Sequence, residues 1–161
     1  MIEMADLVTR QHTILDLKSA NKQQVLQTLA SLASAATGVG QNRILEALVQ
    51  RERLGTTGLG GGIAIPHARI PELEELTGFF ARLTKPVDFD ALDGAPVDLV
   101  FLLLAPETAN ADHLKALARV ARVLRDPRLC EALRNADDPD EAHDILTGRA
   151  ETVSHQPGAH A

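Results

Sequence analysis

The chain has 161 residues, 45% hydrophobic and 24% charged, which is typical of a globular protein large enough for one core. Its net charge of -6 and its four aromatic residues, all phenylalanine, argue against a nucleic-acid partner, because such surfaces are usually basic or carry stacking aromatics. The single cysteine, Cys130, excludes a disulfide framework and fits a reducing compartment. An acidic start and short apolar runs predict a cytoplasmic protein with no membrane insertion.

The first third of the chain predicts two helices. We expect residues 1–12 to be loosely ordered and 13–17 to form a short strand. Asn21 is suited to cap a helix, since apolar residues at helical spacing follow it for about four turns. A second helix is expected over about 41–54, so that Arg51 emerges at its end, beside a glycine-rich stretch.

The middle of the chain predicts strands. After a short apolar segment at 63–65, residues 76–84 alternate between two faces, and 97–105 is a nearly unbroken apolar run bounded by prolines. The last pattern is typical of a central strand that is covered on both faces.

The last third predicts helices. We expect one over about 111–125, with a buried stripe formed by Leu114, Leu117, Ala118, Ala121 and Leu124. Two short helices follow, over 127–135 and 139–147. Helices, then strands, then helices predict an α/β fold with a mixed sheet of about five strands and helices on both faces. A single domain over 1–148 and a disordered tail over 149–161 complete the prediction.

The stretch that departs from an ordinary globular pattern is G-L-G-G-G-I-A-I-P-H, which ends at His67. Glycine allows close backbone approach and proline restricts φ, so the stretch is expected to present this imidazole in a fixed place. It is not a Walker A loop, because no lysine lies between Lys22 and Lys85, and its glycine spacing does not match a dinucleotide fingerprint. Its backbone N–H groups at Gly58, Gly60 and Gly62 could still hold a single phosphate.

Four side chains are candidates for chemistry. His67 could be a neutral nucleophile near pH 7, and His113, in the first turn of the 111–125 helix, could be its partner. Arg51 could clamp a phosphoryl group in a fork geometry. Thr57 could bind an anion or orient His67. The alternative for each is an ordinary structural or solvated residue.

A metal is the other use for two histidines. His67, His113 and Asp112 would supply three ligands, but neighbouring residues on a helix point in different directions. We therefore expect no metal and no cofactor.

The residues R-E-x-x-x-x-T-G-x-G-x-G-I-A-I-P-H at 51–67, together with Asp112-His113-Leu114, resemble the fructose/mannitol-type enzyme IIA domain of the bacterial phosphoenolpyruvate-dependent phosphotransferase system. The likeness spans about residues 13–146. It looks most like the stand-alone nitrogen-regulatory branch of the family, and residues 87–91 and 96–99 also resemble that branch. The sequence departs from the family at Gly61, where asparagine is common, and at 68–69.

The resemblance implies a phosphocarrier in which His67 accepts a phosphoryl group, on Nε2, from an HPr-like phosphocarrier protein. It implies that His113 and Arg51 bind phosphoryl oxygens, and that the protein regulates targets, such as kinases or potassium transporters, according to its phosphorylation state. Two alternatives remain open: the cytosolic IIA component of a fructose- or mannitol-type transporter, and a protein-binding module without phosphoryl transfer.

Overall fold

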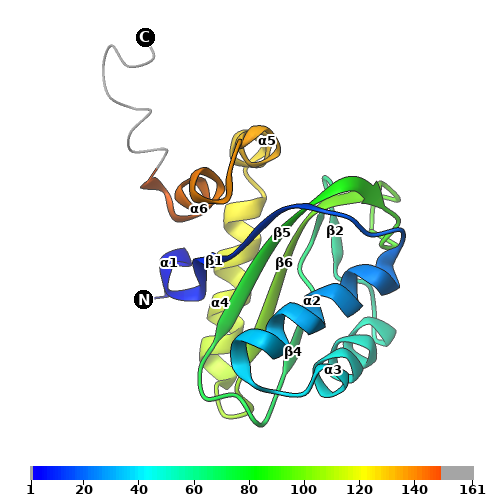
Figure 1. The fold of residues 1–161 in the computed structure, drawn as a ribbon, viewed down its shortest axis with the longest axis vertical. Coiled ribbons are helices and arrows are strands. Elements are labelled where there is room, and N and C mark those ends of the chain that lie inside the picture. The colour runs from blue at the N-terminus through cyan, green and yellow to red at the C-terminus, as the bar shows by residue number, and fades with distance from the viewer. Residues whose placement is uncertain (1, 150–161) are drawn as a thin grey trace.

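The computed structural model of the protein describes residues 2–149, whose elements are shown in Figure 1. Most of the predicted tail at 149–161 lies outside these residues. In chain order the elements are α1 (Met4–Leu7), β1 (Val8–Leu17), α2 (Lys22–Thr37), α3 (Gln41–Arg53), β2 (Gly58–Gly60), β3 (Ile63–Ala64), β4 (His67–Arg69), β5 (Thr77–Val87), β6 (Val97–Ala105), α4 (Asn110–Leu124), α5 (Pro127–Asn135) and α6 (Pro139–Thr147).

One mixed sheet joins the strands in the order β1-β5-β6-β3-β2, and β4 pairs with β6 beyond β3. Strands β1 and β5 are parallel, β5 and β6 are antiparallel, and both β3 and β4 run parallel to β6. The predicted α/β class with a mixed sheet is therefore confirmed. Because β3 and β4 follow each other along the same edge of β6, Pro66 and His67 are held against a central strand.

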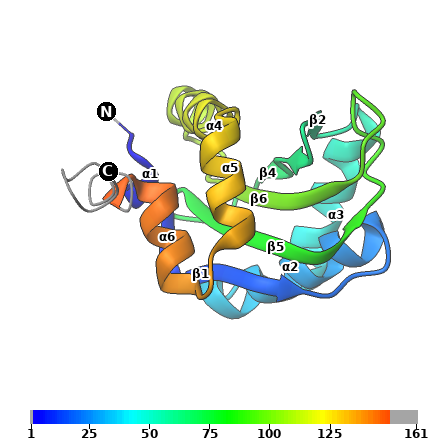
Figure 2. The same cartoon turned by 90° about the horizontal axis from the view of Figure 1, so that it is seen from above.

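Helices cover both faces of the sheet (Figure 2). On β6, Val100, Leu102 and Leu104 pack into a cluster with residues of α2 and α3. Phe101 and Leu103 point the opposite way, into a cluster with residues of α4, α5 and α6. The prediction of a strand buried on both faces is thus confirmed, and the fully buried aliphatic and phenylalanine side chains of this strand anchor the fold.

The prediction of a loosely ordered N-terminus is wrong for the residues that the structure describes. Met4 and Leu7 in α1 and Val8 in β1 are each at most 4% exposed. They join the cluster on the α4–α6 side, and β1 begins at Val8, five residues before the predicted strand. A four-residue helix is too short to show a periodic pattern, so only its packing reveals it.

The predicted buried stripe of α4 is also shifted. Leu114 is 64% exposed, whereas His113, Ala116, Val120 and Leu124 are buried. A leucine at the surface and a histidine beneath it invert the usual preference of these residue types. The inversion places an apolar side chain and an imidazole at one end of α4, beside β4.

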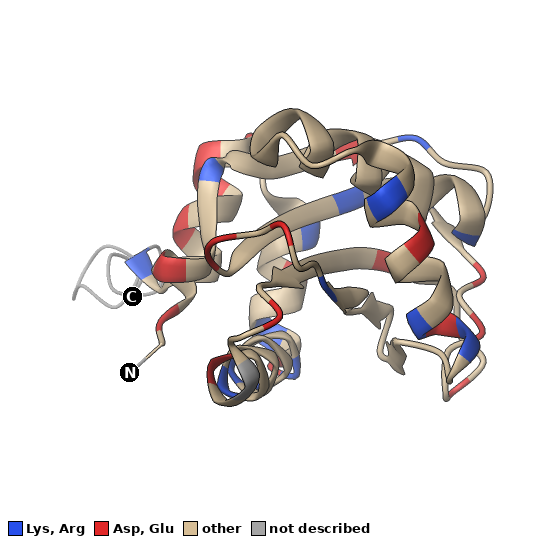
Figure 3. Cartoon of the chain, turned by 90° about the horizontal axis from the view of Figure 1, so that it is seen from below, with Lys and Arg blue, Asp and Glu red and all other residues tan. Residues whose placement is uncertain are grey.

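Lysine and arginine positions are interspersed with aspartate and glutamate positions along the described part of the chain (Figure 3). Within 2–149, no helix is both long enough and apolar enough to span a bilayer.

Candidate functional site

His67 is the first residue of β4, and its backbone is held by β6. The Leu103 N–H donates to the carbonyl of Pro66 at 3.0 Å, and His67 pairs with Leu103 in the parallel ladder. Pro66 and Ile65 are buried, while His67 is half-buried. The strand therefore fixes the backbone and leaves one side of the imidazole accessible.

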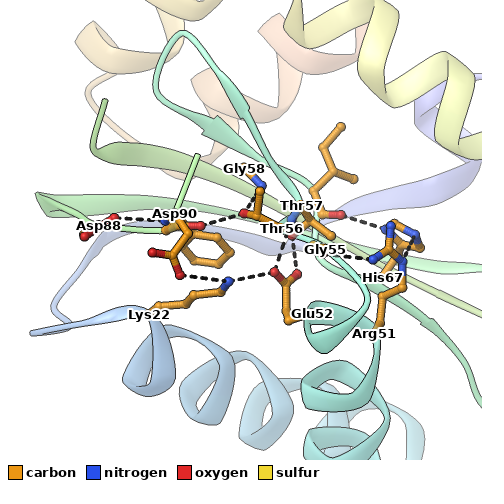
Figure 4. A network of polar contacts seen from close by, with 12 residues as sticks. Lys22, Arg51, Glu52, Gly55, Thr56, Thr57, Gly58, His67, Asp88 and Asp90 are labelled. Carbon is orange, nitrogen blue, oxygen red and sulfur yellow. Dashed lines mark hydrogen bonds and ion pairs between the residues drawn. The ribbon is translucent and has the colours of Figure 1, made fainter. Parts of the chain in front are cut away.

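Both ring nitrogens of His67 have a partner (Figure 4). Nδ1 lies 2.8 Å from the carbonyl oxygen of Ile65, which can only accept, so Nδ1 carries the hydrogen. Nε2 then carries no hydrogen, and its lone pair accepts from Nε of Arg51 at 3.2 Å. The structure thus holds the neutral tautomer in which Nε2 is the nucleophilic atom.

Arg51 reaches this position from the last turn of α3. Its Nη1 donates to the carbonyl oxygen of Gly55 at 3.0 Å, which orients the guanidinium plane toward His67. The predicted position of Arg51 at the end of its helix, beside the glycine-rich stretch, is confirmed.

His113 lies on the other side of His67, with ring centroids 5.7 Å apart and ring planes at 71°. Its Nδ1 accepts from Nε of Arg69 at 3.3 Å, so its hydrogen is on Nε2. That Nε2 is buried and has no hydrogen-bond partner among the described residues. The site therefore contains a buried N–H donor next to the imidazole of His67.

Arg69 is the residue that we did not predict as part of the site. It lies two residues after His67 on β4, and side chains at i and i+2 of a strand share a face. This spacing is the signal that could have identified it. With Arg51, it gives the site two guanidinium groups.

The two imidazoles are uncharged near pH 7. Burial lowers the pKa of His67 below its ordinary 6.5, and the charge of Arg51 adds to this, although the Ile65 carbonyl opposes it. Burial, followed by His67 and Arg69, lowers the pKa of His113 to about 4. A neutral nucleophile between two cations suits an incoming anion.

A cleft of about 600 Å³ lies between α3, β4 and α4, and it is lined by the side chains of Arg51, His67, Arg69 and His113. Leu54 and Leu114 also line it, and they are 84% and 64% exposed. Large exposed leucines that flank a polar cleft mark a surface suited to a protein partner.

The structure places Thr57 behind the cleft. It is 3% exposed, and its N–H and its hydroxyl both donate to the carboxylate of Glu52. Its own carbonyl accepts from the Ile65 N–H at 3.0 Å. Thr57 therefore contacts the backbone that carries His67 and does not line the cleft.

Gly58, Gly60 and Gly62 also lie outside the cleft. They belong to the antiparallel β2–β3 hairpin. The guanidinium of Arg134 in α5 makes two hydrogen bonds to the Asp98 carboxylate, at 2.7 and 2.9 Å. Gly62, at φ +82°, packs against this ion pair. Here the structure accounts for the glycines by packing.

We expect Gly62→Ala to lower the free energy of unfolding by about 2–3 kcal/mol without changing the chemistry at His67. A Cβ would lie 2.5 Å from Nη2 of Arg134 and 2.8 Å from Asp98, and a positive φ adds about 1–2 kcal/mol of strain. Gly61→Ala is the matched control, because its φ is +67° and nothing lies within 4 Å of its Cβ position. Urea denaturation of both variants measures the difference, and equal losses would contradict the packing role.

A metal site finds no support in the geometry. Asp112 is exposed, and residues 2–149 contain no group of three or more histidine, cysteine or acidic side chains that could hold a metal ion.

Comparison with known proteins gives a consistent result. Residues 6–148 match the family described as phosphoenolpyruvate-dependent sugar phosphotransferase system, EIIA 2. A nitrogen regulatory protein of Bradyrhizobium diazoefficiens is 51% identical over 143 residues, covering 89% of this chain and 94% of the relative. The crystal structure of nitrogen regulatory protein IIA-Ntr from Neisseria meningitidis is 35% identical, with a TM-score of 0.85 over 89% of this chain and 99% of that one. Enzyme IIAMTL from Escherichia coli, solved in complex with phosphorylated enzyme IIBMTL, shares the fold at 22% identity and a TM-score of 0.74, covering 89% and 100% of the two chains.

Proposed function

Because the chain belongs to the EIIA 2 family of the phosphoenolpyruvate-dependent sugar phosphotransferase system, we propose that it is a regulatory phosphocarrier that accepts a phosphoryl group on Nε2 of His67. The observation that carries the proposal is that this nitrogen bears no hydrogen and lies at a cleft, between Arg51 and His113. The donor is an HPr-like protein that carries a phosphohistidine.

The transfer needs an in-line nucleophile and stabilisation of the equatorial oxygens. Arg51 releases its hydrogen bond to Nε2 of His67 as the phosphoryl group enters, and the lone pair of Nε2 then attacks phosphorus. A new N–P bond forms, and the donor's N–P bond breaks with its electron pair returning to the donor imidazole. The proton on Nδ1 stays in place, and the Ile65 carbonyl stabilises the positive charge that the ring gains. Arg51, Arg69 and the free N–H of His113 then supply donors for the phosphoryl oxygens.

The rim of the cleft supports a protein as the donor. Leu54 and Leu114 present apolar side chains on opposite walls, and a partner that covers them would also remove water from the transferred group. In the family, enzyme IIAMTL has been solved in complex with a phosphorylated partner.

The regulatory branch is favoured over a sugar transporter because the relative at 51% identity is a nitrogen regulatory protein. We propose that the protein acts in the cytoplasm, where it binds target proteins such as kinases or potassium transporters according to its phosphorylation state. A phosphate adds up to about two negative charges at the cleft, enough to change which surface binds there. Deletion of the gene separates the two branches, since loss of growth on fructose or mannitol would favour transport.

The test of the phosphocarrier role is labelling from phosphoenolpyruvate with enzyme I and the HPr-like carrier. We expect wild-type protein to gain one acid-labile phosphate and His67→Ala to gain none, because the accepting nitrogen is removed. His12→Gln is the matched control, since this histidine stacks on Phe79 away from the cleft. A His67→Ala protein that is labelled like wild type would contradict the proposal.

A further inference from the structure

Glu52 follows Arg51 directly in the chain, but its side chain points to the opposite side of the segment, away from the cleft (Figure 4). Its side chain is only 8% exposed. The carboxylate accepts from three donors: Nζ of Lys22 at 2.8 Å, the Thr57 N–H at 3.1 Å, and the Thr57 hydroxyl. A carboxylate buried to this degree is stable only because all of these donors are in place.

Lys22 is itself held in position. It is the first residue of α2, its side chain is 20% exposed, and its Nζ lies 4.9 Å from the centroid of the Phe89 ring and 3.8 Å from Asp90. The ammonium therefore joins the start of α2 to the end of α3, and it compensates the charge of Glu52 where water is largely excluded.

A chain of hydrogen bonds leads from this carboxylate to the imidazole of His67. Glu52 holds Thr57 through two bonds, and the Thr57 carbonyl accepts from the Ile65 N–H at 3.0 Å. The Ile65 carbonyl in turn accepts from Nδ1 of His67 at 2.8 Å. The orientation of the group that sets the tautomer of His67 thus depends on where Thr57 is held.

The same segment also positions Arg51. Its Nη1 donates to the carbonyl of Gly55, two residues before Thr57. Fixing the 55–57 segment therefore fixes one partner of Arg51 and one partner of His67 together, although neither Glu52 nor Thr57 lines the cleft.

We propose that Glu52, held by Lys22, is a positioning residue that acts through Thr57 and Ile65 to keep His67 in the tautomer with hydrogen on Nδ1 and none on Nε2. Its effect on phosphoryl transfer rests on the function proposed above. Its effect on the tautomer does not, because that is a property of the unphosphorylated protein.

The test uses the full-length protein with Thr57→Val, which removes the hydroxyl at nearly the same shape, and Thr57→Ser, which keeps it. Glu52→Gln removes the charge, and Glu46→Gln on the same helix is the control, since Glu46 is exposed and, within residues 2–149, accepts a hydrogen bond from the Gln50 side chain alone. Long-range proton–nitrogen NMR of the imidazoles above pH 7 reports which nitrogen of His67 carries hydrogen. Labelling kinetics follow on the same samples.

For wild type, Thr57→Ser and Glu46→Gln we expect a single tautomer with hydrogen on Nδ1. For Thr57→Val and Glu52→Gln we expect a mixture of tautomers, and a labelling rate about five- to tenfold lower with an unchanged KM for the carrier, which corresponds to the loss of one hydrogen bond. The unchanged KM is expected because Leu54 and Leu114, the exposed apolar side chains at the cleft, are not replaced.

A wild-type tautomer signal in both Thr57→Val and Glu52→Gln would overturn the inference, even if both variants were less stable. If Glu52→Gln does not fold, the Thr57→Val and Thr57→Ser pair decides the question alone. If wild-type protein takes no phosphate, the proposed function fails, while the tautomer measurement still tests the role of Glu52.

Discussion

Replacing Arg51 with alanine is expected to slow phosphoryl transfer to His67 by about 10²–10³-fold, the usual effect of removing one donor that stabilises developing charge. Arg51 is the guanidinium that contacts Nε2 in the resting protein, at 3.2 Å, so it lies beside the point where the new bond forms. Single-turnover labelling from the phosphorylated carrier measures the rate.

The same replacement is expected to move the pH dependence. The charge of Arg51 contributes to the lowered pKa of His67, so its removal lets that pKa rise toward 6.5. Labelling requires the neutral imidazole, and its rate should therefore begin to fall at a higher pH in Arg51→Ala than in wild type.

Two further variants separate charge from geometry. Arg51→Lys keeps the positive charge but loses the fork, and its rate should lie between wild type and Arg51→Ala. Arg53→Ala is the control, because Arg53 is exposed on the same turn and does not line the cleft. An Arg51→Ala protein labelled within about threefold of wild type would show that the contact at Nε2 does not act in the transfer.

The central strands could be predicted from the sequence because their burial produces local patterns of apolar residues. The apolar run at 97–105 became β6, and the alternation at 76–84 became β5, with Phe79 and Phe80 in opposite clusters. By contrast, α1 is too short for periodicity, and its burial depends on contacts with α4 and α6.

In the candidate site, too, local patterns predicted some residues, but they did not predict contacts between distant segments. Arg51, His67 and His113 could be named from residue type and from a family likeness, and the structure brings these three together. The packing role of the glycines could not be predicted from residue type or from the family likeness. Arg134 occupies the space beside Gly62 from 72 residues further along the chain, and no local pattern reports such a contact.

The helix α4 explains why a pattern of hydrophobic residues misplaced the buried stripe. Position 113 is histidine and position 114 is leucine, so a rule that buries leucine rotates the helix by one residue. The observed helix instead buries the imidazole and exposes the leucine at the rim of the cleft. A local rule fails here at two residues that line the cleft of the candidate site, where such failures are expected.

Burial of His113 is expected to make the protein less stable in acid. Its pKa is about 4 in the folded protein and about 6.5 when unfolded, so the unfolded chain binds more protons between these values. Stability contributed by the neutral ring is complete above about pH 6.5 and is lost as pH falls toward 4. The difference of about 2.5 pKa units corresponds to about 3 kcal/mol.

The variant that isolates this effect is His113→Gln, which cannot take up the proton. Between pH 7 and pH 4, wild type should lose about 3 kcal/mol more free energy of unfolding than the variant, as measured by urea denaturation at each pH. The charge of His67 contributes to the lowered pKa of His113, so the difference between the two proteins reports the titration of His113 together with its coupling to His67. Parallel pH curves would mean that His113 titrates as an exposed histidine does, and that its Nε2–H is not held neutral for an incoming phosphoryl oxygen. A growing gap below pH 6.5 would tie the acid sensitivity of the fold to the group that we expect to bind that oxygen.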